Sequence, residues 1–142
     1  MRLVLIDTHV LIWYLVSPHL LSATALEIIR GVVNDGYPIL ISSMSVVEIC
    51  YLTEKQKIPP LVLERVQAAL NNSNSGMKIL PVSHEIALEM QKIPRETVPE
   101  MCDRIIAATA LYLGLPLVTK DHKIRNLDVI QTIWDSPNPE SP

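Results

Sequence analysis

The sequence predicts a single α/β domain built on a parallel sheet, and three observations support this. Short unbroken apolar runs, such as those at residues 3–6 and 39–41, are typical of strands buried on both faces of a parallel sheet. Between these runs, apolar residues recur with the period of amphipathic helices. The chain has 142 residues, 49% of them hydrophobic, which is enough to bury one core. We expect residues 1–134 to form one domain, followed by a disordered tail over 135–142, which is rich in Pro and Ser.

Strands and helices are expected to alternate along the chain. Ser22 and Ser83 stand where helix N-caps are needed, Gly114 suits a helix C-cap, and Pro116 prevents that helix from continuing. The expected strands are 3–6, 39–41, 79–80, 117–119 and 127–130, with Ile133 and Trp134 packing back onto the last one. The expected helices are 8–15, 22–34, one from Ser42 or Ser45 to about residue 54, 61–70, 83–91, and one that begins near 97–100 and ends at 114.

Composition excludes several classes of protein. The formal net charge of −3 argues against a protein that coats nucleic acid by bulk electrostatics, and 4% aromatics without any Phe give no visible stacking platform for bases. No apolar run reaches the roughly 18 residues of a membrane span. Cys50 and Cys102 do not suggest a disulfide framework, and Asp7 and His9 interrupt the N-terminal apolar stretch. We therefore expect a cytoplasmic protein that is not associated with a membrane.

Asp103 is the residue that most needs an explanation. At helical spacing it shares a face with Ile106, Ala107 and Ala110, and no Lys or Arg follows three or four positions later. Thr97 and Glu100 have the spacing of a capping box, which would place Asp103 one turn too deep to act as the cap. A half-buried carboxylate must be paired, protonated or bound to a cation.

Three further acids are expected to meet Asp103. Asp7 and Asp121 follow the carboxyl ends of predicted strands, the edge at which open parallel sheets place their functional crevice. Glu48 lies on the inward face of the third helix, although Ser45 and Glu48 also have capping-box spacing, and that local role remains an alternative. Each pair of carboxylates about 5 Å apart would repel by on the order of 3 kcal/mol at an effective dielectric of about 20. A hard divalent cation, Mg²⁺ or Mn²⁺, would relieve this repulsion and suits phosphodiester hydrolysis.

The other polar residues near these acids could act at the site or have an ordinary structural role. Thr8 could orient Asp7 or simply begin a helix, and Lys120 could hold a phosphate backbone or belong to a solvated turn. His9 and His122 could touch a phosphate or act as acids, although a metal-bound water removes the need for a histidine base. The large aromatic residues in helical apolar patterns are expected in the core or in a dimer interface; they are Trp13, Tyr14 and Tyr112.

The order and spacing of four segments resemble the PIN-domain ribonucleases, and among them the VapC-type toxins of toxin-antitoxin pairs. The segments are 5–9, 45–48, 103–110 and 117–121. The resemblance implies a three-layer α/β/α sandwich with a mostly parallel central sheet, Mg²⁺-dependent cleavage of RNA, inhibition by a protein antitoxin, and a homodimer. It carries the catalytic and metal-binding role to Asp7, Glu48, Asp103 and Asp121, and Glu100 stands where some relatives have a further acid. From their positions in or beside these segments, Thr8, Glu100, Thr119 and Lys120 are expected to support the acids or to bind the substrate.

Three other functions share some of these sequence features. An aspartyl phosphatase with Asp7 as nucleophile would need a second acid two residues later, where the sequence has His9. A non-catalytic binding protein of the same fold is disfavoured because it would have no need of all four acids. A housekeeping RNA-processing nuclease without an antitoxin remains an alternative.

Overall fold

The computed structural model describes residues 3–135, which contain a five-stranded sheet. The strand order is β3-β2-β1-β4-β5, and every pairing is parallel. The predicted parallel sheet is therefore confirmed. The strands are β1 (Leu5–Ile6), β2 (Ile39–Ser42), β3 (Met77–Leu80), β4 (Leu117–Val118) and β5 (Thr132–Ile133).

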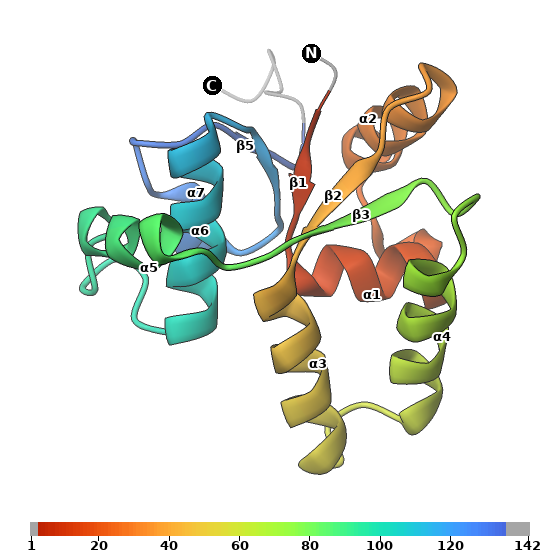
Figure 1. Ribbon diagram of the computed structural model, residues 1–142. Coiled ribbons are helices and arrows are strands. Elements are labelled where there is room, and N and C mark those ends of the chain that lie inside the picture. The colour runs from red at the N-terminus through yellow and green to blue at the C-terminus, as the bar shows by residue number, and fades with distance from the viewer. Residues whose placement is uncertain (1–2, 136–142) are drawn as a thin grey trace.

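Helices cover both faces of the sheet. Figure 1 shows α5, α6 and α7 on one side and α1, α2 and α4 on the other, so the expected three-layer α/β/α sandwich is confirmed. The helices are α1 (Thr8–Val16), α2 (Ala23–Asn34), α3 (Ser43–Glu54), α4 (Pro60–Asn71), α5 (His84–Glu89), α6 (Met101–Leu113) and α7 (His122–Arg125), with short 3₁₀ turns at Pro18–Leu20 and Met90–Lys92.

Alternate residues of the strands feed two separate cores. Ile6 and Ile41 pack with α1, α2 and α4, whereas Leu5, Leu40 and Leu117 pack with α6 and α7. These strand residues are almost completely buried. Burial on both faces is the physical reason that the strands read as unbroken apolar runs instead of alternating polar and apolar positions.

The prediction of a strand at 127–130 is wrong. Leu127 is buried at the end of α7, where its N–H donates to the carbonyl of Ile124, and β5 begins later, at Thr132. Residues 128–130 form a bend in which Asp128 and Val129 are exposed, and a short apolar run alone does not distinguish such a segment from a strand. Trp134 is buried, as expected.

The described residues bear on the predicted tail only at its first position, and they also bear on the expected absence of a membrane span. The predicted tail, apart from Asp135, lies outside the described residues. In the described part of the chain, no helix is both long enough and apolar enough to cross a bilayer.

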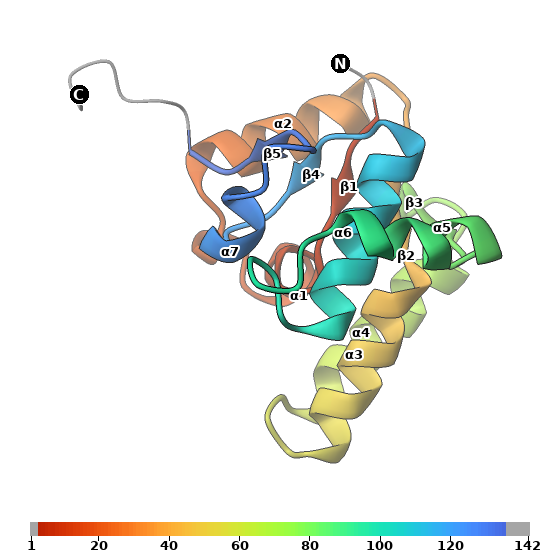
Figure 2. The same ribbon diagram turned by 90° about the vertical axis from the view of Figure 1, so that its left-hand side faces the viewer.

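The strand order places a topological switch point between β1 and β4. The chain adds β2 and β3 on one side of β1 and then returns to add β4 and β5 on the other. At such a point the connections leave in opposite directions, and a crevice opens beyond the carboxyl ends of the two strands. Figure 2 shows the start of α6 next to α3 at this edge, with α1 beside them.

Candidate active site

A cavity of about 430 Å³ lies at the switch point. All four predicted acids line it, together with three of the four predicted supporting residues. The lining residues are Asp7, Thr8, His9, Trp13, Glu48, Glu100, Asp103, Lys120, Asp121 and His122. Thr119, the remaining predicted supporting residue, does not line the cavity but is completely buried immediately before Lys120.

Asp7 and Asp121 are fixed in position because each caps a helix. The Asp7 N–H donates to the carbonyl of Val118 in β4 at 3.1 Å, and the Asp7 Oδ1 accepts from the N–H of Val10 at 3.0 Å. The Asp121 Oδ1 accepts from the N–H groups of Lys123 at 2.8 Å and Ile124 at 3.2 Å. Both caps use Oδ1 alone, so capping and a second role for the same carboxylate are compatible.

Thr119 connects these two acids. Its hydroxyl donates to the Asp7 carboxylate, and its Oγ1 accepts from the Asp121 N–H at 3.0 Å. The side chain is completely buried. Thr119 therefore holds the acid after β1 and the acid after β4 in a fixed relation.

Glu48 is not part of a capping box, contrary to one alternative from the sequence. Helix α3 begins at Ser43, and the Ser42 hydroxyl caps it by accepting from the Met44 N–H at 3.0 Å. Glu48 lies well inside the helix, and its Oε1 is buried without a hydrogen-bond partner among the described residues. Because buried polar atoms nearly always have a partner, this oxygen is a candidate ligand for a bound cation.

Ser45 has a role that the sequence did not reveal. The Thr8 hydroxyl donates to the Ser45 hydroxyl at 3.0 Å in a buried contact between α1 and α3. Thr8 therefore neither caps α1, which Asp7 does, nor bonds to Asp7. Instead it fixes the first turn of α3 against the first turn of α1, and Glu48 follows Ser45 on the same helix face.

The predicted depth of Asp103 in its helix is wrong. Helix α6 begins at Met101 with Glu100 at the N-cap position, and Thr97 belongs to a preceding turn in which its N–H donates to the carbonyl of Pro94. The capping box of Thr97 and Glu100 does not form, because Thr97 lies in the turn that follows Pro94 and not at the start of the helix. Asp103 lies in the first turn, where the helix dipole favours a negative charge.

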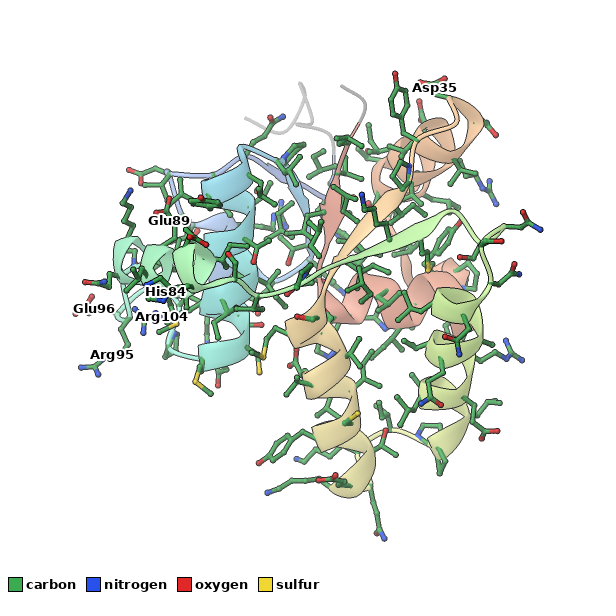
Figure 3. All side chains as sticks on the ribbon, in the orientation of Figure 1. Asp35, His84, Glu89, Arg95, Glu96 and Arg104 are labelled. Carbon is green, nitrogen blue, oxygen red and sulfur yellow. The ribbon has the colours of Figure 1, made fainter. Side chains whose placement is uncertain are left out.

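Asp103 has no compensating cation among the described residues. Its neighbour Arg104 donates from its guanidinium to the carbonyls of Ile93 and Met90 at 3.0–3.2 Å. Figure 3 shows Arg104 on the side of α6 that faces α5. The arginine next to Asp103 is therefore used elsewhere and does not neutralise the carboxylate.

Burial and, for Asp103, the neighbouring acids raise two pKa values. Burial, followed by the charges of Glu48 and Asp121, raises the pKa of Asp103 to about 7. Burial raises the pKa of Asp7 to about 6, although the hydrogen bonds from Thr119 and Val10 act in the opposite direction. Both carboxylates are destabilised in their charged form, mainly because they are buried, and at Asp103 the neighbouring negative charges add to this effect.

The cavity rim carries positive and aromatic groups. Lys123 forms an ion pair with Glu100 at 3.7 Å between two well-exposed side chains, a kind of contact that contributes little to stability. The Lys120 ammonium lies 5.7 Å from the centre of the Trp13 ring. Trp13 packs partly against the core, as predicted, but it also lines the cavity, which the helical pattern did not indicate.

The oxygen ligands of the cavity are of the kind that a hard divalent cation prefers, although they do not surround a single point. Four carboxylates surround one cavity, and Glu48 Oε1 lacks any partner in the described part of the chain. Between residues 3 and 135, however, no three His, Cys, Asp or Glu side chains lie close enough together to hold one ion. Repulsion keeps uncompensated carboxylates apart, so a bound cation would have to draw these side chains inward.

The comparisons with known proteins identify the family. The PIN domain model matches residues 4–130, so the chain belongs to the PIN domain family. The chain is also 27% identical over 126 residues to Ribonuclease VapC22 of Mycobacterium tuberculosis, covering 89% of this chain and 92% of that protein.

Solved structures support the fold. VapBC2 from Rickettsia felis, crystallised with a DNA fragment from its promoter, contains a chain that matches with a TM-score of 0.69 and 18% identity, covering 94% of this chain and 99% of that one. DNA-bound VapBC from Salmonella typhimurium matches with a TM-score of 0.66 and 22% identity, covering 94% and 98%. At these levels of sequence identity, the structural similarity supports a shared fold alone.

The raised pKa of Asp103 predicts how stability depends on pH. Without metal, the folded protein holds this proton more strongly than the unfolded chain, whose pKa is near the usual 3.8. The free energy of unfolding should therefore fall as the pH rises from about 4 to about 7. In EDTA, Asp103→Asn should be at least as stable as the parent above about pH 7, and this advantage should disappear toward about pH 4. Urea unfolding at several pH values measures this, and a pH-independent loss of stability in the variant would indicate a structural hydrogen bond instead.

The hydrogen bond between Thr8 and Ser45 should be measurable as a coupling between the two side chains in the free energy of unfolding. Thr8→Val keeps the shape but leaves the buried Ser45 hydroxyl without its donor, so unfolding should be easier by about 1–3 kcal/mol. In a double-mutant cycle with Ser45→Ala, the second substitution should recover part of this loss. Strictly additive losses in denaturant unfolding would contradict a direct bond in solution.

Proposed function

We propose that this protein is a Mg²⁺-dependent endoribonuclease that hydrolyses RNA phosphodiester bonds. The observation that carries the proposal is the cavity lined by four carboxylates from four separate segments, none of which forms an ion pair with a Lys or Arg of the described residues. Membership of the PIN domain family and the likeness to a protein named Ribonuclease VapC22 support the same activity.

The four acids have the role of holding the cation. Asp7, Glu48, Asp103 and Asp121 supply hard oxygen ligands, which favour Mg²⁺ or Mn²⁺ over zinc. When bound, such an ion polarises a phosphoryl oxygen and lowers the pKa of the attacking water. Thr119 keeps Asp7 and Asp121 in place through its two hydrogen bonds. Lys120, which lines the same cavity, is placed to meet the substrate backbone.

The proposed biological role is that of a toxin inhibited by a protein antitoxin. The similar structures from Rickettsia felis and Salmonella typhimurium are VapBC complexes, and a further one, VapBC-5 from Mycobacterium tuberculosis, is described as a member of a family of toxin-antitoxin systems. We further propose that the chain acts in the cytoplasm as a homodimer. A housekeeping RNA-processing nuclease would use the same site. It would be favoured if expression of the chain cleaved RNA equally with and without its neighbouring gene.

Substitution of the acids should abolish cleavage without unfolding the chain. Asp7→Asn and Asp103→Asn should each lower the rate of RNA cleavage by on the order of 100-fold or more, because each removes a charged metal ligand. EDTA should inhibit the parent, and Mg²⁺ or Mn²⁺ should restore it. Asn keeps an Oδ1 acceptor, so the Asp7 cap of α1 can survive.

Asp35→Asn is the matched control. It makes the same chemical change at an exposed position at the end of α2, far from the cavity (Figure 3), and it should leave the rate unchanged. Circular dichroism establishes that each variant is folded. Full cleavage by folded Asp7→Asn and Asp103→Asn proteins would overturn the assignment of a metal-dependent nuclease.

Metal binding should also appear as a change in stability. An ion that binds only the folded state stabilises it by about 1.4 kcal/mol at ten times its Kd. Mg²⁺ should therefore raise the Tm of the parent and of Asp35→Asn, and raise that of Asp103→Asn much less. Equal shifts in all three proteins would mean that the cation binds somewhere other than this cavity.

A further inference from the structure

One wall of the cavity carries aromatic and basic groups instead of acids. It consists of His9, Trp13 and Lys120, and we call it the aromatic wall. Its three members interact: the His9 and Trp13 rings lie 5.8 Å apart with an angle of 51° between their planes, and the Lys120 ammonium lies over the indole. The catalytic scheme above uses neither ring.

The position of Trp13 is not explained by packing alone. The chain has two Trp residues, and Trp134 is buried with only 7% of its surface exposed. Trp134 supports Trp13 from the core side, with ring centres 6.0 Å apart at 56°. Trp13 itself is only partly buried and lines a polar cavity. A large apolar surface held in such a place by a second indole is typical of a binding group.

Lys120 places its ammonium over one face of the Trp13 indole. Its side chain is exposed, and its ammonium lies 5.7 Å from the ring centre. An ammonium at an exposed site is held over an indole only weakly, whereas a stacked base contributes more. A base could therefore take the place of the ammonium over the ring and release Lys120 toward a phosphate.

The aromatic wall is continuous with the acids along the sequence. His9 and Trp13 are four residues apart on α1, so they share a helix face, and this helix begins directly after Asp7. Lys120 directly precedes Asp121. A phosphate held at the carboxylates would thus have the aromatic wall beside it. The cavity volume of about 430 Å³ lies within the range of small-ligand sites.

We propose that the aromatic wall binds the base of the nucleotide next to the cleaved phosphate in single-stranded RNA, with the base stacked on Trp13 and Lys120 on the backbone. This inference rests on the proposed ribonuclease function and adds to it a subsite that recognises an unpaired base. It assigns Trp13 to substrate binding.

The chain allows a direct optical test. In a protein that combines Asp103→Asn with Trp134→Phe, Trp13 is the sole source of indole fluorescence. Short single-stranded oligoribonucleotides of random sequence, added in Mg²⁺, should quench this fluorescence. Abasic oligonucleotides of the same length, which retain the phosphates, should not. The oligoribonucleotides with bases should also bind about tenfold more tightly, the effect expected of one stacked base.

Substitutions of Trp13 separate stacking from packing. In the Asp103→Asn protein, Trp13→Leu keeps apolar bulk against the core but cannot stack, so it should remove the preference for RNA with bases. Trp13→Tyr should retain most of it. Fluorescence anisotropy of labelled oligonucleotides measures both, and thermal unfolding establishes that each variant is folded.

The outcomes distinguish this inference from the proposed function. If the parent cleaves RNA but the base preference is absent, or survives in folded Trp13→Leu, the stacking subsite is overturned and the nuclease stands. If Trp13 is quenched only by oligonucleotides with bases but the parent does not cleave in Mg²⁺ or Mn²⁺, the nuclease assignment fails and a single-strand binding site remains. Equal quenching by abasic oligonucleotides would also overturn the subsite, because phosphate binding alone would explain it.

Discussion

Mutual repulsion among four carboxylates is the constraint on which this site depends. Asp7 and Asp121 are held by the caps they provide, while Asp103 and Glu48 are carried by the early part of α6 and the interior of α3. Because backbone elements set these positions, the acids cannot move far apart. The repulsion can then be relieved only by a proton or a cation. Three observations indicate carboxylates that lack stabilising partners. They are the raised pKa values of Asp7 and Asp103 and the Glu48 Oε1 without a hydrogen-bond partner among the described residues.

The bonds that build the fold at this edge also build the site. Thr119 lies at the end of β4 and links Asp7 to the backbone of Asp121, so the pairing of β1 with β4 sets the separation of two acids. The contact between Thr8 and Ser45 does the same for α1 and α3, and thereby for Glu48. None of these hydroxyls need touch a substrate. Their effect on chemistry is through the precision with which they hold the carboxylates.

The sequence predicted the sheet and the meeting of the acids better than the local roles of single residues. Runs buried on both faces and the rule for strand ends were sufficient to bring Asp7 and Asp121 together. The two capping boxes, at Thr97 and at Ser45, were wrong because their spacing is short and recurs by chance, whereas the true helix starts follow from where a strand or a turn ends. The dual position of Trp13 could not be predicted, since periodicity gives the face of a helix but not the segments that come to lie against it.

The electrostatics of the cavity also limit how a chain with a net charge of −3 could bind the proposed polyanionic substrate. Of the described residues that line the cavity, Lys120 is the one Lys or Arg, and nearby cations are engaged elsewhere: Lys123 with Glu100, and Arg104 with backbone carbonyls. A single Lys among the described lining residues gives the proposed RNA substrate little electrostatic attraction. Affinity has to come from short-range contacts, a cation shared between carboxylates and phosphate and a base on an aromatic surface, and both require the substrate to be correctly placed. A site of this kind discriminates by geometry, because little long-range attraction holds a strand that does not fit.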